Sequence, residues 1–197
     1  MQVNVIGRFL PALLICISTS SAVVRAQENA PVAAVAPPAN VLSAYNRMMY
    51  RGVKAILLRS AEKMPEESYS FKPTESVRSF GQIVGHVADS QYAFCSPVLG
   101  EKRASPEIEK TKTSKADLIA ALKDAVAYCD RAYEGMTDAS AVEMVKHMGR
   151  DTPKLGTLTT NNVHSIEHYG NMVTYLRMKN IVPPTSEPDF MKEMMKK

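Results

Sequence analysis

Apolar residues recur at helical spacing in four segments of the chain, and each segment therefore predicts an amphipathic helix. One side of the third segment shows the pattern most clearly, because it carries Leu118, Ala121, Leu122, Ala125, Tyr128, Cys129 and Ala132. No stretch alternates between polar and apolar residues for long enough to predict a strand. We therefore expect an all-α domain, most simply a four-helix bundle, with helices at 42–64, 79–97, 114–135 and 157–179.

Residues that favour helix ends support these boundaries. Ser79, followed three residues later by Gln82, forms the pattern of a capping box at the start of the second helix. Pro97 should end that helix, and Gly135 should end the third one. The connection at 136–156 is long for a compact bundle, so the helices need not simply alternate in direction.

The N-terminus has the pattern of an export signal. Arg8 precedes a short apolar run at 9–17, and small residues follow as far as a cleavage site near Ala26. The run is too short for a stable membrane span, which needs about 20 residues. We therefore expect an exported protein, periplasmic or secreted, without stable membrane insertion. The expected divisions are a signal peptide at 1–26, an Ala/Pro-rich tether at 27–41, the helical bundle at 42–186 and a C-terminal tail at 187–197.

The charge of the chain gives no indication of a nucleic-acid partner. The 197 residues carry a formal net charge of +4. Removal of Arg8 and Arg25 with the signal leaves 22 of the 24 basic residues against 20 acidic ones, a net charge of +2. Neither a dense basic stripe nor a set of stacking aromatic residues is present in the sequence, so we expect no nucleic-acid binding.

Two cysteines, Cys95 and Cys129, remain after signal cleavage. In an oxidising compartment such a pair can form a disulfide. Both could instead be small buried apolar residues. The sequence leaves the two alternatives open, because pairing requires that the two Cα atoms come within about 7 Å.

The most informative residues are three of the four histidines. His164 and His168 are four residues apart in the fourth predicted helix, so their side chains share one face. His86 lies among apolar residues of the second helix. Bundles build metal sites from side chains on facing helices, and imidazole is a preferred ligand of zinc and nickel. We therefore predict a divalent-metal site made of His86, His164 and His168, as opposed to three separate histidines with backbone partners.

Other readings of these segments are weaker. Residues 164–168 also match the H-x-x-E-H pattern of certain metalloproteases, but those enzymes need a third carboxylate ligand well downstream and a far larger catalytic domain. His147 lies in a loop rich in glycine and basic residues and is expected at the surface. No catalytic residue follows from the sequence. Candidates that could orient a ligand or a substrate are Asp89, Tyr92 and Asn161.

The chain resembles the DinB-like family of small four-helix-bundle metalloproteins. The matching stretches are 65–73, 78–89 (RSFGQIVGHVAD), 164–177 (HSIEHYGNMVTYLR) and 180–186. The resemblance implies an up-down-down-up bundle and a divalent cation, often zinc or nickel, held by His86, His164 and His168. Members are often homodimers, and the characterised ones include metal-dependent transferases that join small thiols to electrophiles. This chain departs from the characterised members in carrying an export signal.

Two functions follow from these observations. In the first, the protein is a metal-dependent transferase or hydrolase that acts on a small-molecule substrate. In the second, it is a non-catalytic metal-stabilised helical bundle that acts through an interface. The sequence does not decide between an enzyme and a binding protein, and it fixes neither the metal nor the substrate.

Overall fold

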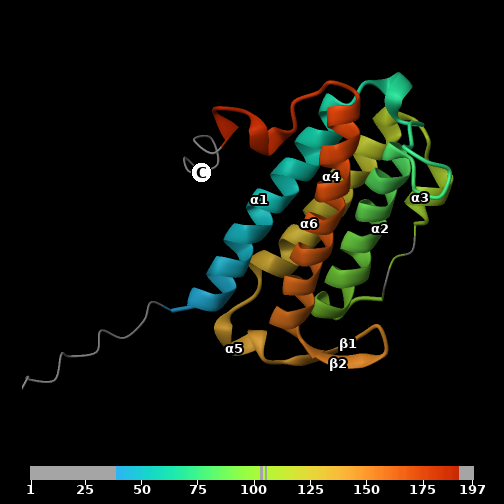
Figure 1. Ribbon diagram of the computed structural model, residues 1–197. Helices are drawn as coiled ribbons and strands as arrows, with labels where there is room; N and C mark the ends of the chain where they lie inside the picture. The colour runs from blue at the N-terminus through green and yellow to red at the C-terminus, as the bar shows by residue number, and fades with distance from the viewer. Residues whose placement is uncertain (1–38, 103, 105, 191–197) are drawn as a thin grey trace, which may run out of the picture. The chain divides into compact units, whose positions relative to one another are not determined.

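The computed structural model describes residues 39–102, 104 and 106–190. The predicted signal peptide and nearly all of the predicted tether lie outside the described residues, as does most of the predicted tail. The long helices are α1 (Val41–Lys63), α2 (Phe80–Leu99), α4 (Lys115–Glu134) and α6 (Lys154–Met178), and Figure 1 shows them side by side. The connections contain η1 (Glu66–Ser68), α3 (Ile108–Thr111), α5 (Asp138–Ala141), β1 (Met144–His147), β2 (Arg150–Pro153) and η2 (Pro184–Ser186).

The four long helices run up, down, down and up (Figure 1). Helices α2 and α4 are parallel, because the disulfide between Cys95 and Cys129 joins their second halves while Gly81 and Leu118 meet in their first halves. The crossover between these two helices contains α3. The all-α bundle and its up-down-down-up order are therefore confirmed.

The predicted start of α2 is confirmed, and the helix ends two residues after the predicted end at Pro97. Ser79 and Gln82 form the expected reciprocal capping box. The helix continues through Pro97 to Leu99 and ends at Gly100, which has a positive φ of 71°. A proline removes only one backbone donor in the last turn, whereas the left-handed glycine stops the helix.

The expectation of no strands is wrong for the segment before α6. Strands β1 and β2 form an antiparallel hairpin in which His147 pairs with Arg150 across a two-residue turn. Each strand has only four residues, too few to produce a recognisable alternation. The hairpin and α5 lie at the same end of the bundle (Figure 1).

A buried polar layer crosses the bundle core. Gln91 of α2 accepts hydrogen bonds from Tyr50 (3.2 Å) and Asn161 (3.0 Å) and donates one to Ser165 (3.1 Å). Each partner comes from α1 or α6, so one side chain ties three helices together. These hydrogen bonds favour one register between the helices, because a slip would break them and leave more buried polar atoms unpaired.

Within the part of the chain that the structure describes, none of the helices combines the length and hydropathy of a membrane span.

Candidate metal centre

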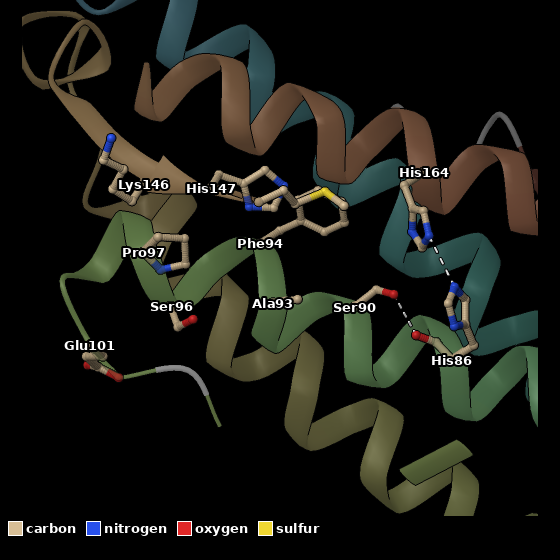
Figure 2. Close-up of a pocket in the computed structure, with 11 residues that line it drawn as sticks. His86, Ser90, Ala93, Phe94, Ser96, Pro97, Glu101, Lys146, His147 and His164 are labelled. Atoms are coloured by element: carbon tan, nitrogen blue, oxygen red, sulfur yellow. Dashed lines mark hydrogen bonds between the residues drawn. The ribbon is translucent and has the colours of Figure 1, made fainter. Parts of the chain in front are cut away.

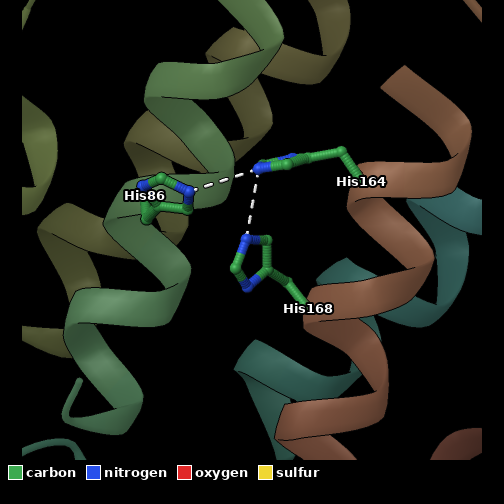
Figure 3. Close-up of side chains that lie close together, drawn as sticks. All are labelled: His86, His164 and His168. Atoms are coloured by element: carbon green, nitrogen blue, oxygen red, sulfur yellow. Dashed lines mark hydrogen bonds between the residues drawn. The ribbon is translucent and has the colours of Figure 1, made fainter. Parts of the chain in front are cut away.

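The three predicted histidines meet between α2 and α6, and Figure 3 shows their rings pointing toward one another. His86 extends from α2 and faces His164 and His168, which lie one turn apart on α6. The Nε2 atom of His164 is 3.3 Å from Nε2 of His86 and 3.2 Å from Nε2 of His168. One ring nitrogen from each residue falls within a group whose members are all within 4.8 Å of one another.

These separations fit a single cation. Two nitrogens bound 2.0–2.1 Å from one tetrahedral zinc ion are about 3.3–3.4 Å apart. Two of the three pairs have this spacing, as measured above. The trio therefore has the converging donor atoms that a three-histidine metal site requires.

Glu109 of α3 orients the ring of His86. Its Oε2 atom is 3.0 Å from Nδ1 of His86, and its Oε1 atom accepts a hydrogen bond of 2.8 Å from Arg78. Burial opposes ionisation of Glu109, but the hydrogen bond and charge of Arg78, aided by His86, outweigh it and lower the pKa of this carboxyl. An ionised carboxylate can only accept, so Nδ1 of His86 donates to it, and in the neutral ring this tautomer leaves the lone pair of Nε2 facing the centre.

Asp89 supports the site indirectly, through the helix that carries Glu109. The sequence nominated it as a candidate to orient His86, but its carboxylate accepts the backbone N–H groups of Ile108 and Glu109 at 3.0 Å each. These contacts hold the start of α3 against α2. Gly85 permits the approach, because a Cβ at that position would lie 2.7 Å from the Cα of Glu109. Glu109 was not identified as a site residue from the sequence. The only local signal of its close approach was Gly85, the residue before His86.

The environment keeps two of the histidines neutral. Burial is the main cause that lowers the pKa of His164, followed by repulsion from His168 and His86, to about 4. Burial also lowers the pKa of His168 to about 4, with further contributions from His86 and Arg78. A neutral imidazole is the form that binds a metal, so both side chains are ready to ligate well below neutral pH.

The other two candidates from the sequence do not reach the histidine cluster. Asn161 is fully buried in the polar layer, where it donates to Gln91 and Tyr133. Tyr92 packs its ring 5.0 Å from that of Tyr128 on α4. Both residues therefore contribute to packing between helices.

The fourth histidine and the two cysteines of the described residues are also placed. His147 is half-buried, and its ring centroid is 4.8 Å from that of Phe94, so the expectation of a simple surface residue is wrong. It stands apart from the three-histidine group found among the described residues. Cys95 forms a disulfide with Cys129, with Cα atoms 5.4 Å apart, which resolves the two alternatives in favour of pairing.

A cavity of about 470 Å³ adjoins the histidine cluster. His86 and His164 form one end of it, and it extends along α2 to Pro97, where the β1–β2 hairpin covers it. Figure 2 shows the histidines at one end and the hairpin residues Lys146 and His147 over the other part. A small molecule in this space would touch two residues of the cluster.

Comparison with known proteins agrees with the helical-bundle fold. The chain is 30% identical over 121 residues to the uncharacterized protein YjoA of Bacillus subtilis, an alignment that covers 59% of this chain and 77% of YjoA. The crystal structure of YjoA matches with a TM-score of 0.57 at 23% identity, covering 69% of this chain and 92% of the other. A DinB-like protein from Bacillus cereus matches with a TM-score of 0.62 at 16% identity, covering 68% and 91%.

A structure with a stated activity has the same fold. The mycothiol-dependent maleylpyruvate isomerase matches with a TM-score of 0.57 at 18% identity, covering 66% of this chain and 60% of that enzyme. The family model of the DinB superfamily matches residues 49–172, which is more than half of the chain. The chain therefore belongs to the DinB superfamily.

Proposed function

We propose that this protein binds one divalent metal ion through His86, His164 and His168 and uses it as a transferase or hydrolase on a small molecule. The observation that carries the proposal is the spacing of the three Nε2 atoms, which suits a shared cation. Zinc and nickel are among the metals that suit imidazole ligands.

The chain contributes ligand orientation, electrostatics and a substrate space. A bound divalent cation supplies Lewis-acid chemistry, since it polarises a carbonyl or lowers the pKa of a water or thiol that it binds. Glu109 holds Nδ1–H of His86 and fixes the direction of its lone pair. Burial keeps His164 and His168 neutral, so these residues act as ligands and do not carry protons at neutral pH.

A catalytic role is favoured over a purely structural one by the cavity. Structural metal sites are closed by four protein ligands, whereas catalytic ones have three and an open position. Three histidines converge in this protein, and two of them also line a cavity of about 470 Å³. The isomerase with the same fold acts with a small thiol, and a metal-bound thiol is one nucleophile that such a site could activate.

Metal content is the first test of the proposal. Elemental analysis of the purified domain should give about one zinc or nickel ion per chain, and His86→Ala and His168→Ala should each lose it. His147→Ala is the matched control, because this histidine lines the same cavity outside the cluster. A wild-type protein that stays metal-free after reconstitution would contradict the proposal.

Catalysis is tested separately on the metal-loaded protein. Hydrolysis of small esters and conjugation of small thiols to electrophiles should be accelerated by wild type and not by His164→Ala. Stoichiometric metal with no acceleration in either assay, and a loss of thermal stability on metal removal, would favour the non-catalytic metal-stabilised bundle.

We also infer that the protein is exported. The signal pattern at 1–26 supports export, and so does the Cys95–Cys129 disulfide, because disulfides persist mainly in oxidising compartments. Fractionation of cells that express the full chain should find it outside the cytoplasm and shortened at a site near Ala26. Retention of the full-length chain in the cytoplasm would contradict export and leave the metal site unaffected.

A further inference from the structure

The turn of the β1–β2 hairpin contains an unusual residue. Met148 and Gly149 form the two-residue connection, and their φ values are 48° and 78°. Two successive positive φ values define a type I′ turn, in which Asn-Gly is strongly preferred. A methionine in the first position is disfavoured, because its Cβ crowds the backbone in this conformation.

The side chain of Met148 lies at the cavity beside the histidines. It is 86% exposed and nevertheless lines the cavity, together with the apolar residues Ala93, Phe94 and Pro97 of α2. Phe94 lies close to the cluster, with its ring centroid 5.4 Å from that of His164. Figure 2 shows the ring of Phe94 between the hairpin and the histidines. An apolar wall therefore adjoins the proposed metal position, with a flexible thioether at its edge.

The combination points to a ligand contact. An exposed methionine in a strained position has no packing role in the folded protein, and backbone strain of this kind gathers at functional sites. Methionine adapts its shape to a ligand and makes favourable contacts with aromatic rings. A flat ring placed against Phe94 and Pro97 would bury the side chain of Met148.

A second cavity near the cluster fits a substrate less well. It has a volume of about 680 Å³ and includes His168 but neither of the other two histidines. It also includes Asn171, whose amide nitrogen is 3.5 Å from Nδ1 of His168. This cavity therefore faces the Nδ1 side of that ring, away from the Nε2 atoms that converge.

We propose that Met148 is a specificity-determining residue, and that the cavity selects small molecules with an aromatic ring a few bonds from the atom that meets the metal. The inference rests on the proposed metal site. The outer end of the cavity, at the exposed residues Glu101 and Lys146, is polar and suits the part of such a molecule that faces water.

Two hydroxamates of different size provide the test, since both bind zinc through the same group. The affinities of acetohydroxamate and 3-phenylpropionohydroxamate are measured by calorimetry on the zinc-loaded protein. Burial of the phenyl ring should make the second compound about tenfold tighter or more. Met148→Asn should reduce that advantage to about threefold or less and leave the affinity for acetohydroxamate unchanged.

The control and the stability of the variants make the result specific. Met144→Asn changes the same residue type on the same hairpin, at a position that is 57% exposed and does not line the cavity, and should keep the full phenyl advantage. Met148→Asn should fold with a Tm equal to or above that of wild type, because asparagine suits the turn. A drop in Tm would contradict the assignment of Met148 to ligand binding.

The remaining outcomes separate this inference from the metal site. Zinc binding with equal affinity for the two hydroxamates, or a phenyl advantage that Met148→Asn retains, would overturn the role of Met148 while the metal site stands. Failure to bind zinc would overturn the proposed function and this inference with it.

Discussion

His164 and His168 are poor bases in this protein, because burial and neighbouring positive charge lower both pKa values to about 4 from an ordinary 6.5. In the unfolded chain each histidine binds a proton below about pH 6.5. The metal-free folded state does not do so until about pH 4. The stability that this difference provides is therefore complete above about pH 6.5 and is lost as the pH falls toward 4.

Urea unfolding of the chelator-treated protein checks this expectation. The free energy of unfolding should fall between about pH 7.5 and about pH 5, because only the unfolded state gains protons in that range. The double variant His164→Gln/His168→Gln should show a smaller fall over the same interval. An equal pH dependence in the two proteins would show that these histidines titrate normally when folded.

Glu109→Gln isolates the effect of the carboxylate on His86. Glutamine can still accept from Nδ1–H, but it lacks the negative charge that strengthens the imidazole as a ligand. We expect zinc affinity to fall about 10- to 100-fold in a competition titration with a chromophoric chelator. Glu107→Gln is the matched control, because Glu107 pairs with Lys110 on the exposed side of the same segment. Equal affinities in the two variants would remove Glu109 from the site.

The histidines could be predicted from the sequence, and Glu109 could not. Spacing on one helix brings His164 and His168 together whatever the rest of the fold does. His86 and Glu109 are 23 residues apart, and their contact depends on a four-residue helix after a loop. Such a short element leaves no periodic signal. The position of Asp89 beneath that helix is equally invisible in the sequence, so its hydrogen bonds to the backbone of Ile108 and Glu109 could not be predicted.

At the scale of elements, the close approach of α3 to α2 depends on Gly85. A Cβ at this position would lie 2.7 Å from Cα and 2.9 Å from N of Glu109, so Gly85→Ala must push α3 away. We expect weaker zinc binding and a lower Tm. In Gly170→Ala the new Cβ meets nothing within 4 Å, and the added helix propensity should leave zinc affinity unchanged. Unaltered zinc affinity in Gly85→Ala would show that α3 can shift without harm to the site.

The disulfide holds α2 and α4 together across the long crossover. Cys95 and Cys129 are 34 residues apart, and closure of a loop of this length is worth about 3–4 kcal/mol through the unfolded state. Cys95→Ala/Cys129→Ala should lower the free energy of unfolding by about that amount. A reducing agent should do the same to wild type and nothing to the double variant. An unfolding midpoint that does not respond to reductant would contradict the pairing.

Helix ends could be predicted from the sequence where local capping residues determine them. Ser79 with Gln82 starts α2 by supplying partners for free backbone N–H groups, a purely local effect. The hairpin before α6 is stabilised by its contact with the bundle and has no strong local signal. Only Val145 and His147 of β1 face inward, and both are half-buried. Two half-buried residues are too few to give an alternating strand pattern, so the hairpin could be recognised only in the structure, where the cavity lies beneath it.

At the scale of the whole molecule, one face of the bundle is apolar and open. Seven large apolar side chains of α1 and α6 are between 43% and 63% exposed there: Val41, Leu42, Tyr45, Met48, Met49, Val163 and Ile166. A groove of about 550 Å³ between the two helices is lined by six of them, all but Met48, together with Leu155 and Val53. Contiguous apolar patches above about 300–600 Å² are uncommon on monomers and often mark protein interfaces.

We propose that a second copy of this chain covers this face. Two identical apolar faces can meet around a two-fold axis and shield each other, which is the commonest arrangement of soluble oligomers.

Light scattering should therefore give about twice the 21.7 kDa of one full-length chain, or about twice the smaller mass of a chain without its signal. Leu42→Lys/Tyr45→Lys should convert it to a monomer, because desolvating two lysines at the centre of an apolar interface is costly. Val142→Lys is the control, since Val142 is 73% exposed outside the groove. A wild-type protein that stays monomeric at high concentration would contradict the dimer, and dissociation by Val142→Lys would place the interface elsewhere.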